Sequence, residues 1–156
     1  MSGGYKTVIL KGRGIRKEAL AGGVIQPGDL IFLNSAGKYL RHATAGGKCG
    51  PVFAVEQEMF GKGIGTNYAN LEQVEAEAVQ SGAEVQVNIA AAAAAIVVGD
   101  LLSSAGDGTL KKAVAFSQLG TPTFVVTAAD NPIARAMEAL DNSGGATILQ
   151  LVAEIL

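Results

Sequence analysis

Short apolar runs separated by glycine-rich turns dominate the chain, and this pattern predicts strands rather than helices. In residues 98–113, Leu101 and Leu102 form one apolar run, Leu110 begins a second, and residues 105–108 (Ala-Gly-Asp-Gly) lie between them. Glycines accept the positive φ values that tight hairpin turns require. The segment is therefore predicted to be a β-hairpin.

The same sequence pattern occurs a second time, in residues 27–43. Both segments begin with Gly-Asp and a leucine and continue as a predicted strand. They then turn at Ser-Ala-Gly or Ala-Gly-Asp-Gly and return through leucine and basic residues. The two copies lie about 70 positions apart, and their alignment needs a two-residue gap inside the turn. Flanking segments also match in order. These pairs are 23–25 with 94–96, 51–56 with 132–138, and 81–87 with 144–150.

The repeated landmarks predict two duplicated half-units, about residues 19–89 and 90–156. Two copies are too few for a solenoid, so we expect the halves to share one core and to be related by a pseudo-two-fold. The buried residues of that core are predicted to include Leu30, Phe32, Leu101 and Leu110.

Residues 70–80 fit two patterns. The spacing of Leu71, Val74 and Ala78 suits a helix, whereas residues 74–78 alternate with the period of a strand. A glycine turn and a second alternating run, 85–89, follow, so we favour two strands joined by a turn. The repeat aligns the polyalanine segment 90–95 with two glycines, so no helix is expected there.

Further strands are predicted at residues 5–10, 51–55, 123–127, 132–138 and 146–156, with a loop or short turn of helix at 115–121. The fold class is therefore mainly β: a β-sandwich or barrel-like body built from two half-units. We assign residues 19–156 to a single β-rich domain and residues 1–18 to a basic, extended N-terminal arm.

The arm is distinguished by its charge. Five cations precede the first acidic residue, and residues 1–48 carry a net charge of +6 against −8 for the remainder. One aromatic residue and no reading motif argue against direct nucleic-acid binding, so we expect the basic run to be either a solvated face or a contact to an acidic protein surface. The predicted contact residues are Tyr5, Lys6, Lys11, Arg13, Arg16 and Lys17.

Composition favours a subunit of an assembly. Only 17% of residues are charged, 5% are aromatic, and glycine accounts for 21 residues. A surface of small, weakly charged residues is typical of proteins that pack against neighbours. No signal peptide, membrane span or membrane partner is expected.

Candidate chemistry is sparse. The sole histidine, His42, lies on the return strand of the first hairpin and is aligned with Lys112, which indicates an exposed strand residue rather than a base. Asp29 and Asp100 begin equivalent hairpins, where aspartate commonly binds turn amides. Cys49 is the single cysteine, so no intrachain disulfide is possible. We predict no enzyme activity, metal or cofactor, and a structural turn at residues 61–65.

The chain resembles the capsid decoration, or cement, proteins of tailed bacteriophages over roughly residues 19–156. The similar segments are the alanine-rich lead into 98–102, the turn 105–110, and residues 134–139, 51–58, 61–64, Tyr68 and 81–85. The basic arm departs from the family pattern.

This resemblance implies a compact β body on the outer surface of an icosahedral head, in the virion, made in the bacterial host cytoplasm. It implies binding to the major capsid protein, bridging of neighbouring capsid subunits, and homotrimers at three-fold and quasi-three-fold positions. The alternative is a small-ligand or peptide- or sugar-binding β-domain, for which Tyr5, Tyr39 and Tyr68 are the tyrosines available for stacking.

Overall fold

The computed structural model describes residues 6–115, 117–119, 125–127 and 129–156, and its fold is mainly β, as the sequence predicts. The strands are β1 (Ile9–Lys11), β2 (Gly14–Ala21), β3 (Ile31–Leu33), β4 (Lys38–Arg41), β5 (Val52–Ala54), β6 (Gln73–Val79), β7 (Glu84–Ile89), β8 (Leu101–Ser104), β9 (Leu110–Lys112), β10 (Ser117–Leu119), β11 (Val125–Thr127), β12 (Ala134–Ala136) and β13 (Leu149–Ile155). A short 3₁₀ turn, η1 (Glu58–Phe60), lies between β5 and β6.

The first half of the chain forms a closed ring of five strands, which we call the first barrel. Its order is β3-β4-β2-β6-β5, and a bridge between Leu30 and Phe53 brings its two ends together. The contact of β2 with β4 is parallel, and the other ladders are antiparallel. The inward-facing residues of these strands make a core of their own.

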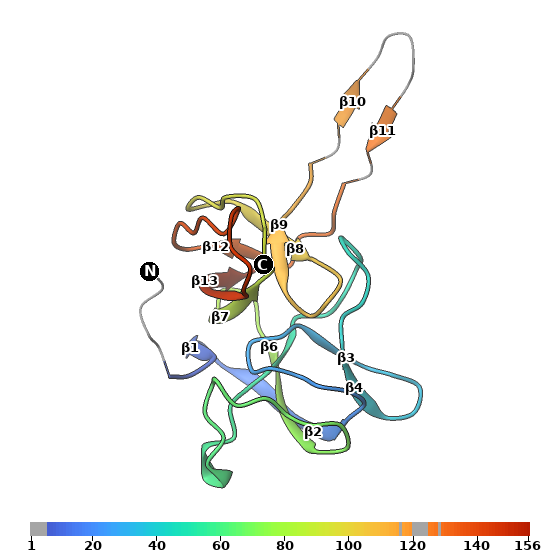
Figure 1. Ribbon diagram of the computed structural model, residues 1–156, viewed down its shortest axis with the longest axis vertical. Coiled ribbons are helices and arrows are strands. Elements are labelled where there is room, and N and C mark those ends of the chain that lie inside the picture. The colour runs from blue at the N-terminus through green and yellow to red at the C-terminus, as the bar shows by residue number, and fades with distance from the viewer. Residues whose placement is uncertain (1–5, 116, 120–124, 128) are drawn as a thin grey trace.

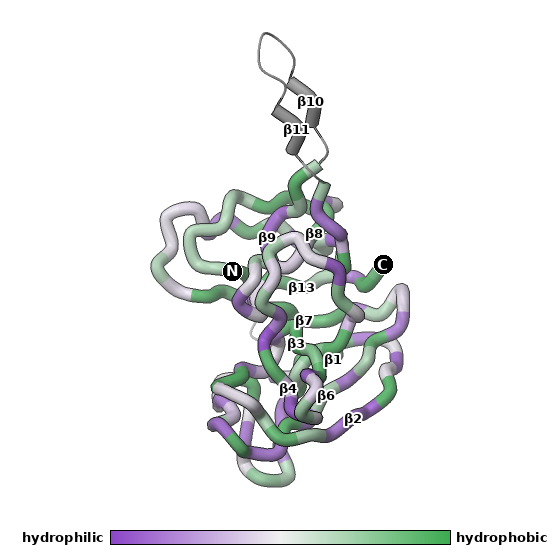
Figure 2. Tube along the Cα trace, turned by 90° about the vertical axis from the view of Figure 1, so that its right-hand side faces the viewer, coloured by the Kyte–Doolittle hydropathy of each residue, from purple (hydrophilic) through white to green (hydrophobic). Residues whose placement is uncertain are grey.

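The second half repeats this ring as the second barrel. Its order is β7-β13-β12-β8-β9, and a parallel contact between Ile89 and Leu110 closes it. Each strand has a counterpart in the first barrel: β7 corresponds to β2, β8 to β3, β9 to β4, β12 to β5 and β13 to β6. The predicted duplication is confirmed by this shared order, and the two barrels lie one above the other along the long axis (Figures 1 and 2).

The boundaries of the repeat differ from those that the sequence suggested. The rings span residues 14–79 and 84–155, so β7 belongs to the second half and not to the first. The sequence match of 81–87 with 144–150 paired β7 with β13, because both are alternating strands after a glycine turn. The hairpins correspond without a gap, since Ile31 pairs with Arg41 and Leu102 with Lys112.

The halves do not share one core. Leu102 and Leu110 lie in the cluster of the second barrel, and Leu30 and Phe53 of the first barrel extend that cluster across the contact between the barrels. For two of the four predicted core residues the prediction of burial is wrong: Phe32 is half-buried, and Leu101 is 41% exposed. In β8 the side-chain alternation of a strand turns Leu102 inward and therefore Leu101 outward.

The N-terminal segment is part of the sheets rather than an arm outside them. Residues 9–11 pair with β7, and residues 14–20 pair with β6 along most of its length. Gly12, with φ +92°, makes the turn between β1 and β2 close to Ala83, where a Cβ would come within 2.7 Å of the Ala83 methyl. An unpaired β6 edge would leave its backbone groups without partners, so pairing prevails over repulsion among the cations.

The remaining local predictions are largely confirmed. Residues 73–79 and 84–89 are two strands joined by a turn, and residues 90–95 are not helical. Residues 117–119, expected in a loop or helical turn, form strand β10, which pairs with β11 and stands away from both barrels (Figure 1). Residues 123 and 124 of the predicted strand 123–127 lie outside the described residues.

Candidate functional site

The most exposed apolar side chains of the described residues belong to one loop of the first barrel. Met59 is 90% exposed and Phe60 is 71% exposed, both in η1. The loop is held closed at its base by backbone hydrogen bonds of 2.9 and 3.1 Å between Gln57 and Lys62. Gly61, with φ +74°, ends η1 in the left-handed conformation. The loop therefore presents a methionine and an aromatic ring to solvent from a defined base.

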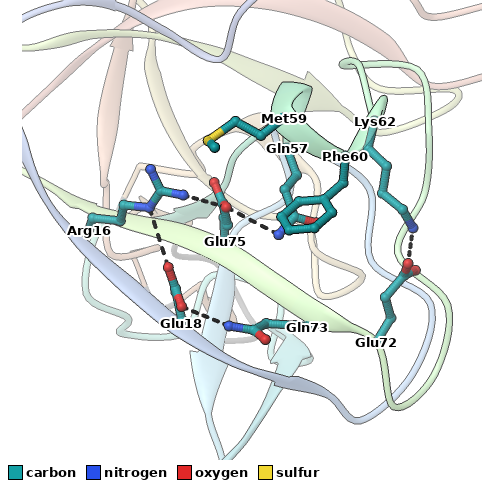
Figure 3. Close-up of a pocket in the computed structure, with 9 residues that line it drawn as sticks. All are labelled: Arg16, Glu18, Gln57, Met59, Phe60, Lys62, Glu72, Gln73 and Glu75. Atoms are coloured by element: carbon teal, nitrogen blue, oxygen red, sulfur yellow. Dashed lines mark hydrogen bonds and ion pairs between the residues drawn. The ribbon is translucent and has the colours of Figure 1, made fainter.

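A surface pocket of about 590 Å³ lies between this loop and the outer face of β2 and β6. Figure 3 shows Met59 and Phe60 over the pocket and polar side chains of the two strands on its floor. The lining residues are Arg16, Glu18, Gln57, Met59, Phe60, Lys62, Glu72, Gln73 and Glu75.

The pocket floor is an ion-pair network centred on Arg16. Its guanidinium pairs closely with the Glu75 carboxylate and lies 3.6 Å from that of Glu18. Gln57 Nε2 donates to Glu75 at 3.1 Å, and Gln73 Nε2 donates to Glu18 at 2.7 Å (Figure 3). Because each charged group already has a partner, the floor is ordered before any ligand or partner arrives.

The rim of the pocket is anchored to the barrel beneath it. Lys62 pairs with Glu72, and this hydrogen bond holds the pKa of the Glu72 carboxyl below its usual value. The Lys62 ammonium also lies 5.6 Å from the ring centre of Tyr68. Tyr68 is buried and donates to the Val55 carbonyl at 2.6 Å, and burial raises its pKa to about 12.

The sequence-predicted contact residues are divided between two places. Lys11, on β1, pairs with Glu84 of the second barrel at 2.9 Å. Arg16 lies in the pocket, whereas Arg13, in the turn before β2, and Lys17, next to Arg16 on β2, are exposed and, among the described residues, form no ion pair. Lys6 is exposed at the start of the described chain. Tyr5 lies outside the described residues.

Strand β2, which carries Arg16 and Lys17, also has an open edge. β2 pairs with β6 from Gly14 to Leu20, but on its other side it pairs with β4 only at Leu20 and Ala21. Within the described part of the chain, residues 14–19 therefore form a free sheet edge. Ile15 is exposed on this edge between the charged residues.

The other candidate residues from the sequence, His42, Asp29, Asp100 and Cys49, lie in contacts within the fold rather than in a shared site. His42 is buried between the barrels, not exposed, with Nδ1 2.7 Å from Ser104 Oγ, and desolvation lowers its pKa. Its counterpart is Ala113, since the N–H of each residue donates to the corresponding leucine carbonyl, Leu30 or Leu101.

Asp29 and Asp100 do not face one another. Asp29 pairs with Arg41 at 2.6 Å and Asp100 with Lys112 at 2.9 Å, each within its own barrel. Cys49 is half-buried, and burial raises the pKa of its thiol, which disfavours the reactive thiolate.

In the described residues, no group of three or more histidine, cysteine, aspartate or glutamate side chains is placed to hold a metal ion, and no helix there is long and apolar enough to cross a membrane. No protein-family model matches the chain, and no curated protein does so.

Sequence reasoning missed the loop residues Met59 and Phe60. The available signal was an adjacent methionine and phenylalanine between Glu58 and Gly61, in a segment without strand alternation. Tyr39 and Tyr68, two of the three tyrosines that a ligand-binding domain would offer for stacking, are both buried. Phe60 is therefore the aromatic ring that the first barrel exposes most.

Proposed function

We propose that this chain is a structural decoration protein of a tailed-bacteriophage capsid. It binds the major capsid protein on the outer surface of the head, as a homotrimer, and stabilises the shell by bridging neighbouring subunits. The proposal combines the sequence resemblance with the surface of the first barrel. In this account the chain acts by binding, without catalysis or a cofactor, and belongs to the virion.

The observation that carries the proposal is the pairing of exposed apolar anchors with cations on a rigid base. Met59 and Phe60 lie beside Arg16 of β2 around the pocket, and Arg13, which precedes β2, and Lys17 of β2 are further exposed cations of this segment. Methionine, aromatic residues and arginine are enriched at protein interfaces, where a few such anchors provide most of the binding energy. The closed barrels beneath them limit the conformational cost of docking.

The energetics suit many weak contacts acting together. Burial of one such apolar side chain contributes about 1.5–3 kcal/mol, which is modest for a single copy. A trimer that engages three sites converts later contacts into intramolecular ones, so its avidity exceeds the affinity of one subunit. The cations Arg13 and Lys17 favour an acidic capsid surface and add a salt-dependent contribution to the association rate.

The test is attachment of purified protein to undecorated heads built from the major capsid protein of the same phage. Phe60→Ala and Met59→Ala should each weaken attachment at least ten-fold, while Leu149→Ala, which shortens an exposed leucine of the second barrel, should not. The double variant Arg13→Ala with Lys17→Ala should reduce the salt dependence of attachment to heads. Undiminished attachment of the Met59 and Phe60 variants would refute docking through this loop, and failure of the wild-type chain to bind heads would refute the function.

A peptide- or small-ligand-binding domain is the second candidate, favoured by the pocket of about 590 Å³. Its ordered Arg16–Glu75 pair could orient a polar ligand under the Phe60 ring. Titration of the labelled protein with peptide and oligosaccharide mixtures, followed by backbone amide shifts, distinguishes the two candidates. Saturable shifts confined to this pocket would favour ligand binding.

A further inference from the structure

The contact between the two barrels is made by a backbone insertion. The N–H of Leu30 donates to the carbonyl of Gly108 at 2.7 Å, and the N–H of Gly108 donates to the carbonyl of His42 at 3.1 Å. The Gly108 peptide of the second barrel thus lies between the start of β3 and the end of β4. It must be a glycine there, because a Cβ would come within 2.8 Å of the Arg41 side chain and φ is +85°.

Polar side chains complete this contact. Asn88 Nδ2 donates to Asp29 Oδ1 at 2.8 Å and to the Pro27 carbonyl at 3.0 Å. We call the surface of the first barrel that takes part the front face, and the surface of the second barrel the rear face. The front-face residues are Pro27, Gly28, Asp29, Leu30, Arg41, His42 and Phe53, and the rear-face residues are Gln86, Asn88, Ser104 and Gly108.

The contact joins two different faces, so the barrels are arranged head to tail rather than around the expected pseudo-two-fold. In a two-fold arrangement, Gly37, the counterpart of Gly108, would contact Leu101, the counterpart of Leu30. Gly37 instead has open space where a Cβ would lie, and Leu101 is exposed. Among the described residues, nothing therefore covers one front face, on the second barrel, and one rear face, on the first barrel.

The uncovered front face keeps the shape of the covered one. Gly99 has φ +91°, the same value as Gly28, and the Asp100–Lys112 pair stands where Asp29 pairs with Arg41. The carbonyl of Leu101 accepts from the N–H of Ala113 at 2.8 Å, but in the described chain no reciprocal backbone bond joins the Leu101 N–H to the Ala113 carbonyl. The Leu101 N–H and the Ala113 carbonyl correspond to the Leu30 N–H and the His42 carbonyl, which bind the Gly108 peptide on the covered front face.

The uncovered rear face carries the matching turn. Gly37, with φ +71°, sits in the β3–β4 turn as Gly108 does in the β8–β9 turn. Inside the chain, Asn88 of the rear face contacts Pro27 of the front face. On the open faces, the counterpart of Asn88 is Leu20, in the first barrel, and the counterpart of Pro27 is Val98, in the second barrel.

A second pair matches in the same way. Inside the chain, Ser104 of the rear face contacts His42 of the front face. On the open faces, the counterpart of Ser104 is Leu33 and the counterpart of His42 is Ala113. Leu20, Leu33 and Val98 are all exposed, and Ala113 is half-buried. The polar side chains of Asn88, Ser104 and His42 are thus replaced by apolar ones on the open faces.

We propose that the open front face of one copy binds the open rear face of a second copy, with the Gly37 turn inserted between Leu101 and Ala113. Such a head-to-tail contact closes into a ring when its rotation permits and otherwise gives open chains. The inference deepens the trimer of the proposed function and rests on it only for the number of copies.

The first experiment measures self-association of the free full-length protein by sedimentation up to millimolar concentration. Leu20→Asp and Leu101→Asp should each weaken it at least ten-fold, and Leu149→Asp, a matched change outside both faces, should not. A mixture of the two single variants should form a dimer and nothing larger, because each variant retains the face that the other has lost. Isologous contact would not give this complementation.

The second experiment traps the contact. In a Cys49→Ser background, Leu33→Cys with Ala113→Cys should form disulfide-linked oligomers on mild oxidation, and Leu33→Cys with Leu149→Cys should not exceed its single-cysteine controls. A chain that stays monomeric at millimolar concentration and gives no cross-link above these controls overturns the inference. Docking on heads is tested separately through Phe60 and Met59, so a failure of self-association can be distinguished from a failure of the proposed function.

Discussion

The first and second barrels have the same skeleton but different surroundings. In each, an aspartate accepts from a backbone N–H three residues earlier: Asp29 from Gln26 and Asp100 from Val97, at 2.8 and 2.9 Å. Each aspartate also pairs with a cation on the returning strand. This turn and its ion pair are therefore built from local sequence and are retained in both copies.

The outer surfaces of the two copies have diverged according to what covers them. Leu30 and Phe53 are fully buried beneath the second barrel, whereas their counterparts are the exposed Leu101 and Arg135. The comparison shows that a repeated motif determines the backbone, while the neighbouring unit determines which outer residues are apolar.

The largest expected effect comes from leucine truncation at this covered position. Leu30→Ala removes a fully buried side chain from the contact between the barrels and should lower the free energy of unfolding by about 2–5 kcal/mol. Leu101→Ala, the same change at the exposed counterpart, should cost about 0.5 kcal/mol or less. Urea denaturation of the two variants at low protein concentration measures both. Equal losses would contradict the assigned difference in burial.

The next effect concerns the paired aspartates. Asp29→Ala leaves Arg41 and the buried Asn88 amide without their carboxylate and should cost about 3 kcal/mol. Asp100→Ala breaks a more exposed pair with Lys112 and should cost about 1 kcal/mol. Thermal unfolding at neutral pH compares the variants. A larger loss for Asp100→Ala would reverse the comparison.

Much of this architecture follows from the sequence. The Gly-Asp turns and alternating strands give both hairpins, and the glycine at residue 82 separates β6 from β7. These features depend on backbone conformation and side-chain period, which are local properties.

The remaining features depend on distant partners. The cations of residues 11–17 look like an extended arm until β7 is seen to pair with Lys11, and β6, about 60 residues later, with Arg16 and Lys17. Leu30 and Leu101 occupy identical motifs, so no local pattern tells which one the other barrel covers. The Met59–Phe60 loop lacks periodicity, and its exposure results from the closed base at Gln57 and Lys62.

The smallest effect is the pH response of the two aspartates. Burial, the dominant influence, raises the pKa of Asp29 above 3.8, whereas the hydrogen bond from Lys112 lowers the pKa of Asp100 below that value. Ionising Asp29 therefore costs stability, and this cost develops as the pH rises from 3.8 through its folded pKa. The contribution of ionised Asp100 is present above 3.8 and is lost as the pH falls through its lower folded pKa.

Carboxyl-carbon NMR titration tests this order directly. The midpoint for Asp29 should lie above 3.8 and that for Asp100 below it. Coincident midpoints, or the reverse order, would show that the covered and uncovered copies do not differ in desolvation as the structure indicates.

The central claim is that one front face is covered within the chain and its repeat is open. Amide hydrogen exchange at Leu30 and Leu101, measured by NMR on the monomeric Leu20→Asp variant, tests it most directly. The Leu30 amide, which donates to Gly108 between the barrels, should exchange only through large-scale opening and so at least 100-fold more slowly than the Leu101 amide. Equal protection of the two amides in the monomer would contradict the account.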